Sequence, residues 1–353
     1  MALHKNHHAN VVVIGGGTGT HTVLKGLKLY DWLNLTAIVS MADNGGSTGI
    51  LRDELGVLPP GDIRQCLVAL SESDQLMRDL FNYRFGTGQL KGHNFGNLFL
   101  SALEKVTSSF DQAVSKTSEV LKIKGRVVPV TLESTHLYGV LKNGKVLNGE
   151  HAVTTANLRG HDQINRVFLK PRVQASAKAL AAIREANLIV VAPGTLYSSI
   201  IPIFLVNGIA KAIHNSKAKK IVVCNLMAKG IFTRGFSVDD FLKALEKYAG
   251  QNTFDYVIYN KRLPRSNLLK RYQHEGMPVA PPLFVKNKSR TFTKVQDKLR
   301  PIFIGGDLVA RDPYRPNLND PLKRQRTLIR HNPERLAKII VDIIKREKRG
   351  YPR

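Results

Sequence analysis

The sequence predicts an α/β fold whose core is a mainly parallel, doubly wound sheet. Short apolar runs rich in β-branched residues alternate along the chain with segments whose apolar residues have helical spacing. Several of these runs end in a glycine-rich turn, as strands of nucleotide-binding sheets often do before a helix. These observations favour a Rossmann-like architecture with strands at residues 10–14, 35–39, 126–130, 188–192, 220–225 and 256–260.

The first predicted strand stops at a run of glycines, and a helix follows from Thr20 to Tyr30. Backbone N–H groups and the helix dipole favour an anion at such a start, and glycines let a phosphate approach closely. Thr20 stands where a dinucleotide fingerprint has its third glycine, and no Walker ending is present. The alternative is a purely structural strand-to-helix turn. The candidate ligand-binding residues here are Gly15, Gly16, Gly17, Thr18 and Gly19.

A second glycine-rich loop follows the strand at 35–39, where sheets of this type usually place an acid that reads a ribose. Asp43 is the candidate, because its carboxylate can accept hydrogen bonds from sugar hydroxyls or hold a hydrated Mg²⁺. It can equally form an Asx-turn that only caps the loop. Asn44 and Ser47 carry suitable hydrogen-bonding groups and suit turns as well.

A third candidate segment contains Asp62 and Arg64. Asp62 can cap a helix that begins at Ile63. Arg64, on the first turn of that helix, can reach a phosphate or pair with Asp62 or Asp43. Helix capping and ligand binding are compatible roles for this segment.

Two further polar loops precede predicted helices. His93 and Asn94 lie before a helix that starts near Leu98, and we interpret both as residues that face a ligand. The second loop lies at the carboxyl end of the strand at 188–192, the edge where open α/β sheets bind ligands. Its candidates are Gly194, Thr195, Tyr197 and Ser198.

Two local patterns complete the predicted topology. Asn143-Gly144 between alternating apolar residues predicts a type I′ hairpin, and so a small antiparallel hairpin appendage, from residues 137–141 and 145–147. Asn332 followed by Pro333 predicts the N-cap and first residue of a helix that docks on the core.

Length and composition favour one nucleotide-binding domain. The chain has 353 residues, 43% of them hydrophobic, which is enough for one large core. We predict a flexible N-terminus at 1–9, the domain at 10–345 and a basic tail at 346–353, with long loops at 287–300 and 313–326. No apolar run approaches the roughly 18 residues needed to cross a bilayer, so we expect a cytoplasmic protein. Cys66 and Cys224 lack metal spacing and should be reduced core residues.

The net charge of +26 invites a nucleic-acid interpretation, because a basic face attracts polyanions. Much of the excess lies after Asn260, in stretches without an aromatic, zinc-finger or leucine-zipper module. We therefore expect a solvated basic surface and no specific nucleic-acid partner. The sequence leaves homo-oligomer formation open.

The polar loops occur in an order that resembles the YvcK/CofD family. The resemblance runs from about Asn10 to Asn225, with a looser match at 330–333. CofD members of the family transfer 2-phospholactate to a deazaflavin precursor with Mg²⁺. YvcK members are similar to nucleotide-sugar binders, with UDP-N-acetylglucosamine as the implied ligand, and are linked to gluconeogenic growth and cell shape in bacteria.

The loop after Asp43 places this chain on the YvcK side of the resemblance, as a gluconeogenesis factor. Asn44 and Ile50 depart from the family pattern, which commonly has an aspartate and an arginine there. Losing a carboxylate weakens a metal site most, so we expect no firm Mg²⁺ site at Asp43, no catalytic residue and no turnover. A CofD-like phospholactate transferase remains the alternative. The resemblance adds Asn225, Tyr272 and Arg330 as ligand contacts.

Overall fold

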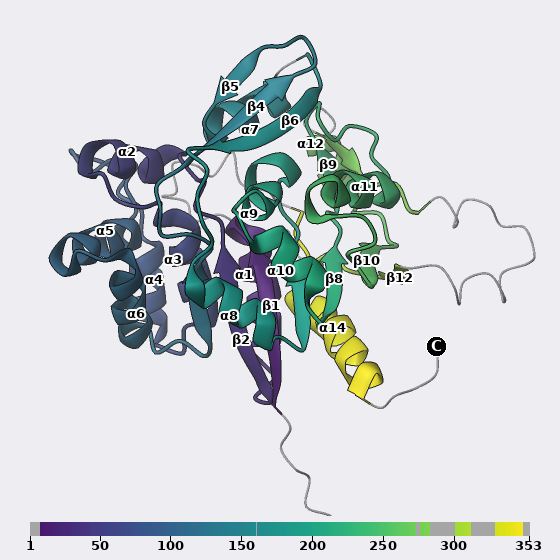
Figure 1. Cartoon of the computed structure of the whole chain (residues 1–353), viewed down its shortest axis with the longest axis horizontal. Helices are drawn as coiled ribbons and strands as arrows, with labels where there is room; N and C mark the ends of the chain where they lie inside the picture. The colour runs from purple at the N-terminus through teal and green to yellow at the C-terminus, as the bar shows by residue number, and fades with distance from the viewer. Residues whose placement is uncertain (1–7, 160, 273–275, 283–300, 312–328, 349–353) are drawn as a thin grey trace, which may run out of the picture.

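Seven parallel strands form the central sheet of the computed structural model, which describes residues 8–159, 161–272, 276–282, 301–311 and 329–348 (Figure 1). The strand order is β12-β10-β8-β7-β1-β2-β3, and every neighbouring pair is parallel. This confirms the predicted α/β fold. The strands are β1 (Ala9–Gly15), β2 (Leu33–Val39), β3 (Arg126–Pro129), β7 (Leu188–Val191), β8 (Lys219–Val223), β10 (Tyr256–Asn260) and β12 (Ile302–Gly306).

The sheet is buried on both faces, which explains why its strands are continuous apolar runs. On one face, α1 (Gly17–Leu27) packs against α3 (Gly61–Leu70) and α14 (Pro333–Lys348). In front of the sheet in Figure 1 lie α8 (Ala177–Glu185) and α10 (Ile209–Asn215). The reversal of strand order between β1 and β7 requires this placement, since right-handed crossovers on either side of the reversal lie on opposite faces.

The remaining helices flank this core. Between β2 and β3 the chain adds α2 (Gly46–Leu55), α4 (Gln75–Asn82), α5 (Phe95–Thr107) and α6 (Phe110–Val120). After β7 come the π-helical turn η1 (Leu196–Ile200) and α9 (Ile201–Phe204), and later α11 (Val238–Ala249) and α12 (Ser266–Tyr272). A short antiparallel pair joins β9 (Met227–Lys229) to β11 (Gly276–Pro278).

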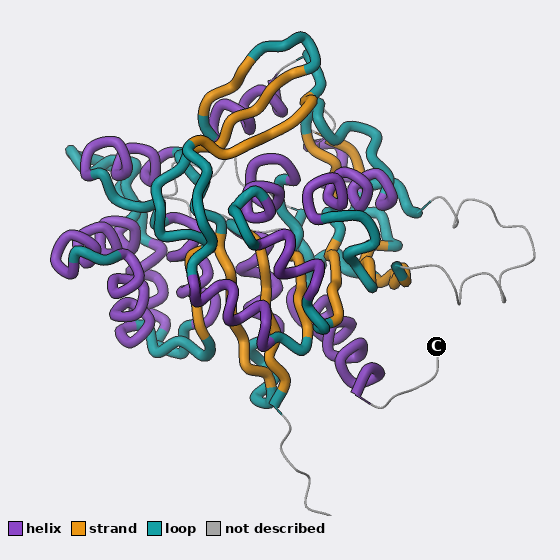
Figure 2. Tube along the Cα trace, viewed as in Figure 1, coloured by secondary structure: helices purple, strands orange, loops and turns teal. Residues whose placement is uncertain are grey.

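A three-stranded antiparallel sheet lies above the carboxyl edge of the central sheet, at the top of Figure 2. The sheet consists of the predicted hairpin strands β4 (His136–Leu141) and β5 (Val146–Asn148) and of β6 (Ile164–Lys170). The helix α7 (Glu150–Arg159) connects β5 to β6 and contacts β4 and β5. The prediction of a type I′ turn in this hairpin is wrong. Only Gly144 of the Asn-Gly pair has a positive φ, and Leu141 and Lys145 bracket a three-residue loop.

Several helix starts lie earlier than predicted. The α3 helix begins at Gly61 after Pro60, so Asp62 lies inside its first turn and does not cap it. Asn94 caps α5 by accepting a hydrogen bond from the Asn97 N–H at 3.2 Å, so the helix begins at Phe95, three residues before the expected start near Leu98. The predicted cap at Asn332 is confirmed, because its side chain accepts a hydrogen bond from the Arg335 N–H at 2.9 Å.

Some predictions fall on parts of the chain that are only partly described. Residues 1–7 of the predicted N-terminal segment, both predicted long loops and the last five residues of the basic tail lie outside the described residues. The tail begins inside α14, which continues to Lys348. Cys66 and Cys224 are buried free thiols, as expected. Among the described helices, none is long and apolar enough to cross a membrane.

Candidate functional site

The loops that follow β1 and β7 meet where the strand order reverses. Open α/β sheets form a crevice at this position, because the two loops turn to opposite faces. The meeting is close: a Cβ added to Gly19 would lie 1.7 Å from the carbonyl oxygen of Pro193. Gly19 therefore allows the start of α1 to contact the loop after β7, and only a residue without a side chain fits there.

The glycines before α1 serve the fold as well as the crevice. A Cβ added to Gly16 would lie 2.2 Å from Oδ2 of Asp62. The Gly17 N–H donates a hydrogen bond to the Asp62 carboxylate, so one donor at this helix start is already satisfied within the chain. Gly15 and Gly16 are both buried and pack within the chain, whereas Thr18 and Gly19 line a cavity.

We call this space the anion cavity. Its volume is about 150 Å³, and it lies beside the N-terminus of α1, where the helix dipole favours negative charge. Lys229 and Arg330 add two cationic side chains to its wall. His331 also lines it, but burial lowers the pKa of this imidazole to about 4, so it is neutral near pH 7. The polar wall comprises Thr18, Gly19, Thr22, Gly194, Thr195, Asn225, Lys229, Arg330 and His331.

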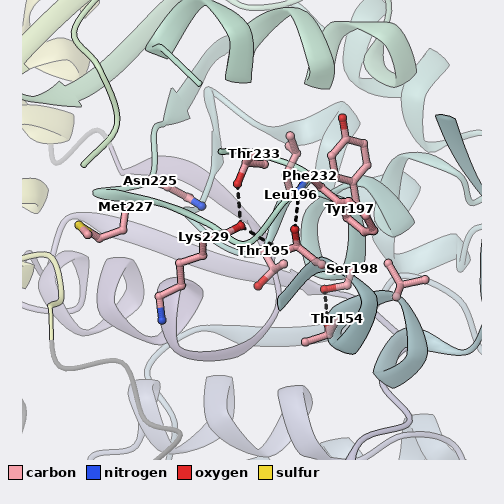
Figure 3. A pocket seen from close by; sticks show the side chains of 12 residues that line it. Thr154, Thr195, Leu196, Tyr197, Ser198, Asn225, Met227, Lys229, Phe232 and Thr233 are labelled. Atoms are coloured by element: carbon pink, nitrogen blue, oxygen red, sulfur yellow. Dashed lines mark hydrogen bonds between the residues drawn. The ribbon is translucent and has the colours of Figure 1, made fainter. Parts of the chain in front are cut away.

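A smaller space, the hydroxyl cavity, adjoins the anion cavity through shared walls at Thr195, Asn225 and Lys229 (Figure 3). Its volume is about 50 Å³. Hydroxyl and amide groups line it, and Figure 3 shows two of their hydrogen bonds, from Thr154 to Ser198 at 2.9 Å and from Thr233 to the Lys229 carbonyl at 2.8 Å. Burial raises the pKa of the Tyr197 phenol to about 12, so that group also stays protonated.

Asn225 connects the parts of the site. Its side-chain oxygen accepts a hydrogen bond from the Gly194 N–H at 3.0 Å, and its amide donates one to the Gly194 carbonyl at 2.8 Å. This two-way contact fixes the loop after β7 beside the end of β8. Asn225 lines the anion cavity, the hydroxyl cavity and a third cavity of about 270 Å³.

Three carboxyl groups, those of Asp43, Asp62 and Glu150, interact at the carboxyl edge of the sheet. Burial raises the pKa of Asp62 well above its usual value, and the charges of Asp43 and Glu150 raise it further. Burial and the charge of Asp43 raise the pKa of Glu150 to about 7. The first residue of α7 therefore exchanges its proton near neutral pH.

These carboxyl groups do not form a ready metal site. Asp43 makes the Asx-turn anticipated as its alternative, because Oδ1 accepts the Gly45 N–H at 2.9 Å, and Thr48 also bonds to it. Asp62 is bound by Gly17. Within the described ranges, no group of three or more His, Cys, Asp or Glu side chains is arranged to hold a metal ion. The Asp43 and Asp62 carboxylates are thus hydrogen-bonded within the chain.

The second and fourth candidate loops contact each other. The Ser47 hydroxyl lies 3.3 Å from Nδ1 of His93 and accepts the Asn94 N–H at the same distance. The Asn44 side chain accepts the His151 N–H at 2.8 Å, which ties this loop to α7. None of these four candidates lines the three cavities, so the structure places them beside the site.

Arg64 is held inside the protein. Its guanidinium is buried and donates to Oδ1 of Asn97 at 3.0 Å and to Oδ1 of Asn82 at 2.8 Å. Its positive charge lowers the pKa values of Asp43 and Asp62 and so opposes the increase that burial causes.

Tyr272 ends α12, but its side chain is outside what the structure describes.

Sequence reasoning missed six polar residues of these two cavity walls: Thr22, Thr154, Asn157, Lys229, Thr233 and His331. Asn157 and Thr154 belong to α7, whose position depends on long-range contacts such as the hydrogen bond from the Phe232 N–H to the Asn157 side chain at 2.8 Å. The cap motif beside His331 was a usable signal, because it places that residue next to the start of α14.

Glu150→Gln should flatten the dependence of stability on pH. An acid whose pKa is about 7 in the folded protein, against an ordinary value of 4.5, binds its proton more tightly when folded. Stability should therefore fall as pH rises from about 4.5 to 7, and the variant should lack on the order of 2–3 kcal/mol of this fall. Urea unfolding between pH 5 and 8 measures it, with exposed Glu54→Gln as control. Parallel curves for wild type and Glu150→Gln would contradict the assignment.

Comparisons with known proteins identify the family. A family model described as 2-phospho-L-lactate transferase CofD matches residues 11–294. The gluconeogenesis factor of Bacillus subtilis is 35% identical over 337 residues, which cover 95% of this chain and 98% of that protein. The gluconeogenesis factor of Listeria innocua is 41% identical over 269 residues, 76% of this chain and 82% of that one.

A solved structure extends the likeness to the fold. The crystal structure of a Bacillus halodurans protein matches with a TM-score of 0.83 at 35% identity, covering 95% of this chain and 99% of that one. The match to the family model spans most of the chain, and the relatives match over most of their own length. The chain therefore belongs to the CofD family, on the branch of the gluconeogenesis factors.

Proposed function

We propose that this protein binds a nucleotide sugar, UDP-N-acetylglucosamine, and acts as a regulator that senses it. The observation that carries the proposal is the anion cavity at the reversal of strand order, bounded by the start of α1 and by Arg330. A diphosphate fits this wall chemically. Backbone N–H groups at the helix start can donate hydrogen bonds to its oxygens, and a guanidinium can bind its oxygens in pairs.

The neighbouring walls suit the rest of such a ligand. A sugar presents several hydroxyl groups, and the hydroxyl cavity presents Thr154, Ser198 and Thr233 beside the anion cavity. Asn225 belongs to both walls and keeps its position through Gly194. In this proposal Tyr272 covers the nucleotide from the end of α12.

The relatives support a physiological role for the protein. Proteins named gluconeogenesis factor match over nearly the whole chain, which supports a role in gluconeogenic growth and, in this proposal, in cell shape. We place the protein in the cytoplasm, where nucleotide sugars are made. The carboxyl groups near the cavity have partners inside the chain, and this supports binding without turnover.

A second function is favoured by one specific finding. The matching family model is described as a 2-phospho-L-lactate transferase, so transfer of phospholactate to a deazaflavin precursor is the enzymatic alternative. It requires groups that stabilise charge developing at phosphorus, commonly a metal with several oxygen ligands. The engaged oxygens of Asp43 make this the weaker proposal.

Prolonged incubation with Mg²⁺ should return UDP-N-acetylglucosamine intact. Mass spectrometry measures the fraction of ligand recovered intact. Asp43→Asn should lower the affinity for the ligand but leave this recovered fraction unchanged, because Asp43 shapes the loop and transfers no group. Phospholactate and a deazaflavin acceptor are tested in a parallel reaction. Conversion of the nucleotide sugar, or a transfer that Asp43→Asn abolishes, would establish the enzyme instead.

A further inference from the structure

Three side chains, those of Glu150, Thr154 and Ser198, connect the carboxyl groups to the hydroxyl cavity. The Thr154 hydroxyl lies 2.7 Å from Oε1 of Glu150 and 2.9 Å from Oγ of Ser198. Ser198 also forms a hydrogen bond to the Glu150 carboxyl group. Thr154 and Ser198 both line the cavity, whereas Glu150 stands behind them. We call these three residues the hydroxyl relay.

Two elements hold the relay in place. Glu150 and Thr154 are four residues apart on α7, so their side chains lie on the same face of the helix. Ser198 belongs to η1, which contacts α7. A π-helical turn is rare and often occurs at a functional site. The Asn44 side chain fixes the start of α7 by accepting the His151 N–H at 2.8 Å.

The protonation state of Glu150 determines where the relay hydrogens point. Each hydroxyl group has one hydrogen and can donate it in one direction only. An ionised Glu150 only accepts, so both hydroxyl hydrogens turn toward it, and these two positions offer the cavity only lone pairs. A protonated Glu150 donates to Thr154, Thr154 donates to Ser198, and the Ser198 hydrogen is then directed into the cavity.

The hydroxyl cavity takes only a small group of a ligand. A buried water needs about 10–15 Å³ by the measure that gives this cavity about 50 Å³, so it has room for a single carbonyl or phosphate oxygen and its nearest neighbours. Such an oxygen is a hydrogen-bond acceptor. It therefore fits the form of the relay in which Ser198 supplies a donor.

The groups around Glu150 keep its proton close to release at neutral pH. Asp43, in the loop after β2, raises the pKa of Glu150, and Glu150 in turn raises the pKa of Asp62 on α3. Lys229 adds a cationic side chain to the cavity wall. Among the described elements, β4, β5 and η1 contact α7, and their titratable side chains are His136 and Tyr138 of β4 and Tyr197 of η1.

We propose that Glu150 is a positioning residue that acts through Thr154 and Ser198 to direct a hydroxyl hydrogen into the hydroxyl cavity, so that the protonated form of the site binds an acceptor oxygen of the ligand. The assignment rests on the proposed function, because its ligand is the nucleotide sugar. It makes ligand affinity depend on pH, since binding and protonation of Glu150 favour each other.

Calorimetric titration with UDP-N-acetylglucosamine at pH 6 and pH 8 tests the relay. Glu150 has a pKa of about 7, so only about one tenth of the protein is protonated there at pH 8, and affinity should be about tenfold weaker than at pH 6. Titrations at pH 7 in two buffers of different ionisation enthalpy should show uptake of about half a proton per ligand.

Three variants separate the relay from other effects. Glu150→Gln should bind equally at both pH values, to within about twofold, and take up no proton, because its amide donates at every pH. Thr154→Val should bind more weakly at pH 6 and lose most of the pH dependence, because it interrupts the relay. Thr233→Val is the matched control, since Thr233 lines the same cavity but donates to the Lys229 carbonyl at 2.8 Å, and it should keep the tenfold ratio.

Circular dichroism checks the fold of each variant, and Thr154→Val decides the question if Glu150→Gln unfolds. Equal wild-type affinities at pH 6 and pH 8 without proton uptake would overturn the relay alone. A tenfold ratio that survives in Thr154→Val would also overturn it, because the charge of Glu150 would then act without the hydroxyl groups. Failure of the wild type to bind at either pH would overturn the proposed function together with the relay.

Discussion

Gly19→Ala should destabilise the protein by about 3 kcal/mol and remove ligand binding. The added Cβ would lie 1.7 Å from the Pro193 carbonyl oxygen, and a backbone atom cannot rotate away as a side chain can. The start of α1 would have to move from the loop after β7. That movement opens the crevice at the strand reversal, so stability and affinity should fall together. Urea unfolding and calorimetric titration with UDP-N-acetylglucosamine measure the two effects.

Gly86→Ala is the matched control for this variant. No atom lies within 4 Å of the Cβ position at Gly86, so its stability should stay within about 0.5 kcal/mol of wild type. If Gly19→Ala behaves like this control, the two loops do not form the close contact on which the crevice depends.

Arg64→Met should cost about 3–5 kcal/mol of stability. The side chain is 6% exposed and donates to Oδ1 of buried Asn97 and to Oδ1 of exposed Asn82, so its loss leaves the buried Asn97 oxygen without this donor. It also removes the positive charge that favours ionised Asp43 and Asp62.

We expect Arg64→Met to lose more stability at pH 8 than at pH 5, because the carboxylates that Arg64 no longer compensates are charged at the higher pH.

Lys116→Met serves as the surface comparison. Lys116 pairs with Glu119 at 3.1 Å, but both side chains are about 60% exposed, so solvent screens the pair and its loss should cost less than about 0.5 kcal/mol. Thermal and urea unfolding of both variants measure the contrast. Equal small losses would show that Arg64 lies in a solvated position and does not support the loops.

The parts of the fold that local sequence determines could be predicted. Strands such as β1 and β7 are short apolar runs with turn signals, and the Asn332 cap needs only its own neighbours. The wrong details depend on long-range contacts. Asp62 is a good cap by residue type, yet its carboxylate binds the Gly17 N–H of another helix, a contact that spacing along the chain does not reveal.

The residues of the candidate site could be predicted mainly where they lie just beyond the carboxyl end of a strand. Thr18, Gly19, Gly194, Thr195, Asn225 and Arg330 line the anion cavity, and all but Arg330 lie just beyond the carboxyl end of a strand. The helix α7 was missed because its apolar spacing is weak and its place depends on contacts with distant loops. Glu150 accordingly became visible only in three dimensions.

Thermal unfolding with and without ligand tests the central claim most directly. Wild-type protein with UDP-N-acetylglucosamine at about 100 times its dissociation constant should gain about 2.7 kcal/mol, whereas NAD at the same concentration should stabilise it less. Arg330→Gln should lose most of the gain, because the paired guanidinium contacts with the diphosphate are absent. Equal stabilisation by NAD, no stabilisation by the nucleotide sugar, or a full gain in Arg330→Gln would contradict nucleotide-sugar binding in the anion cavity.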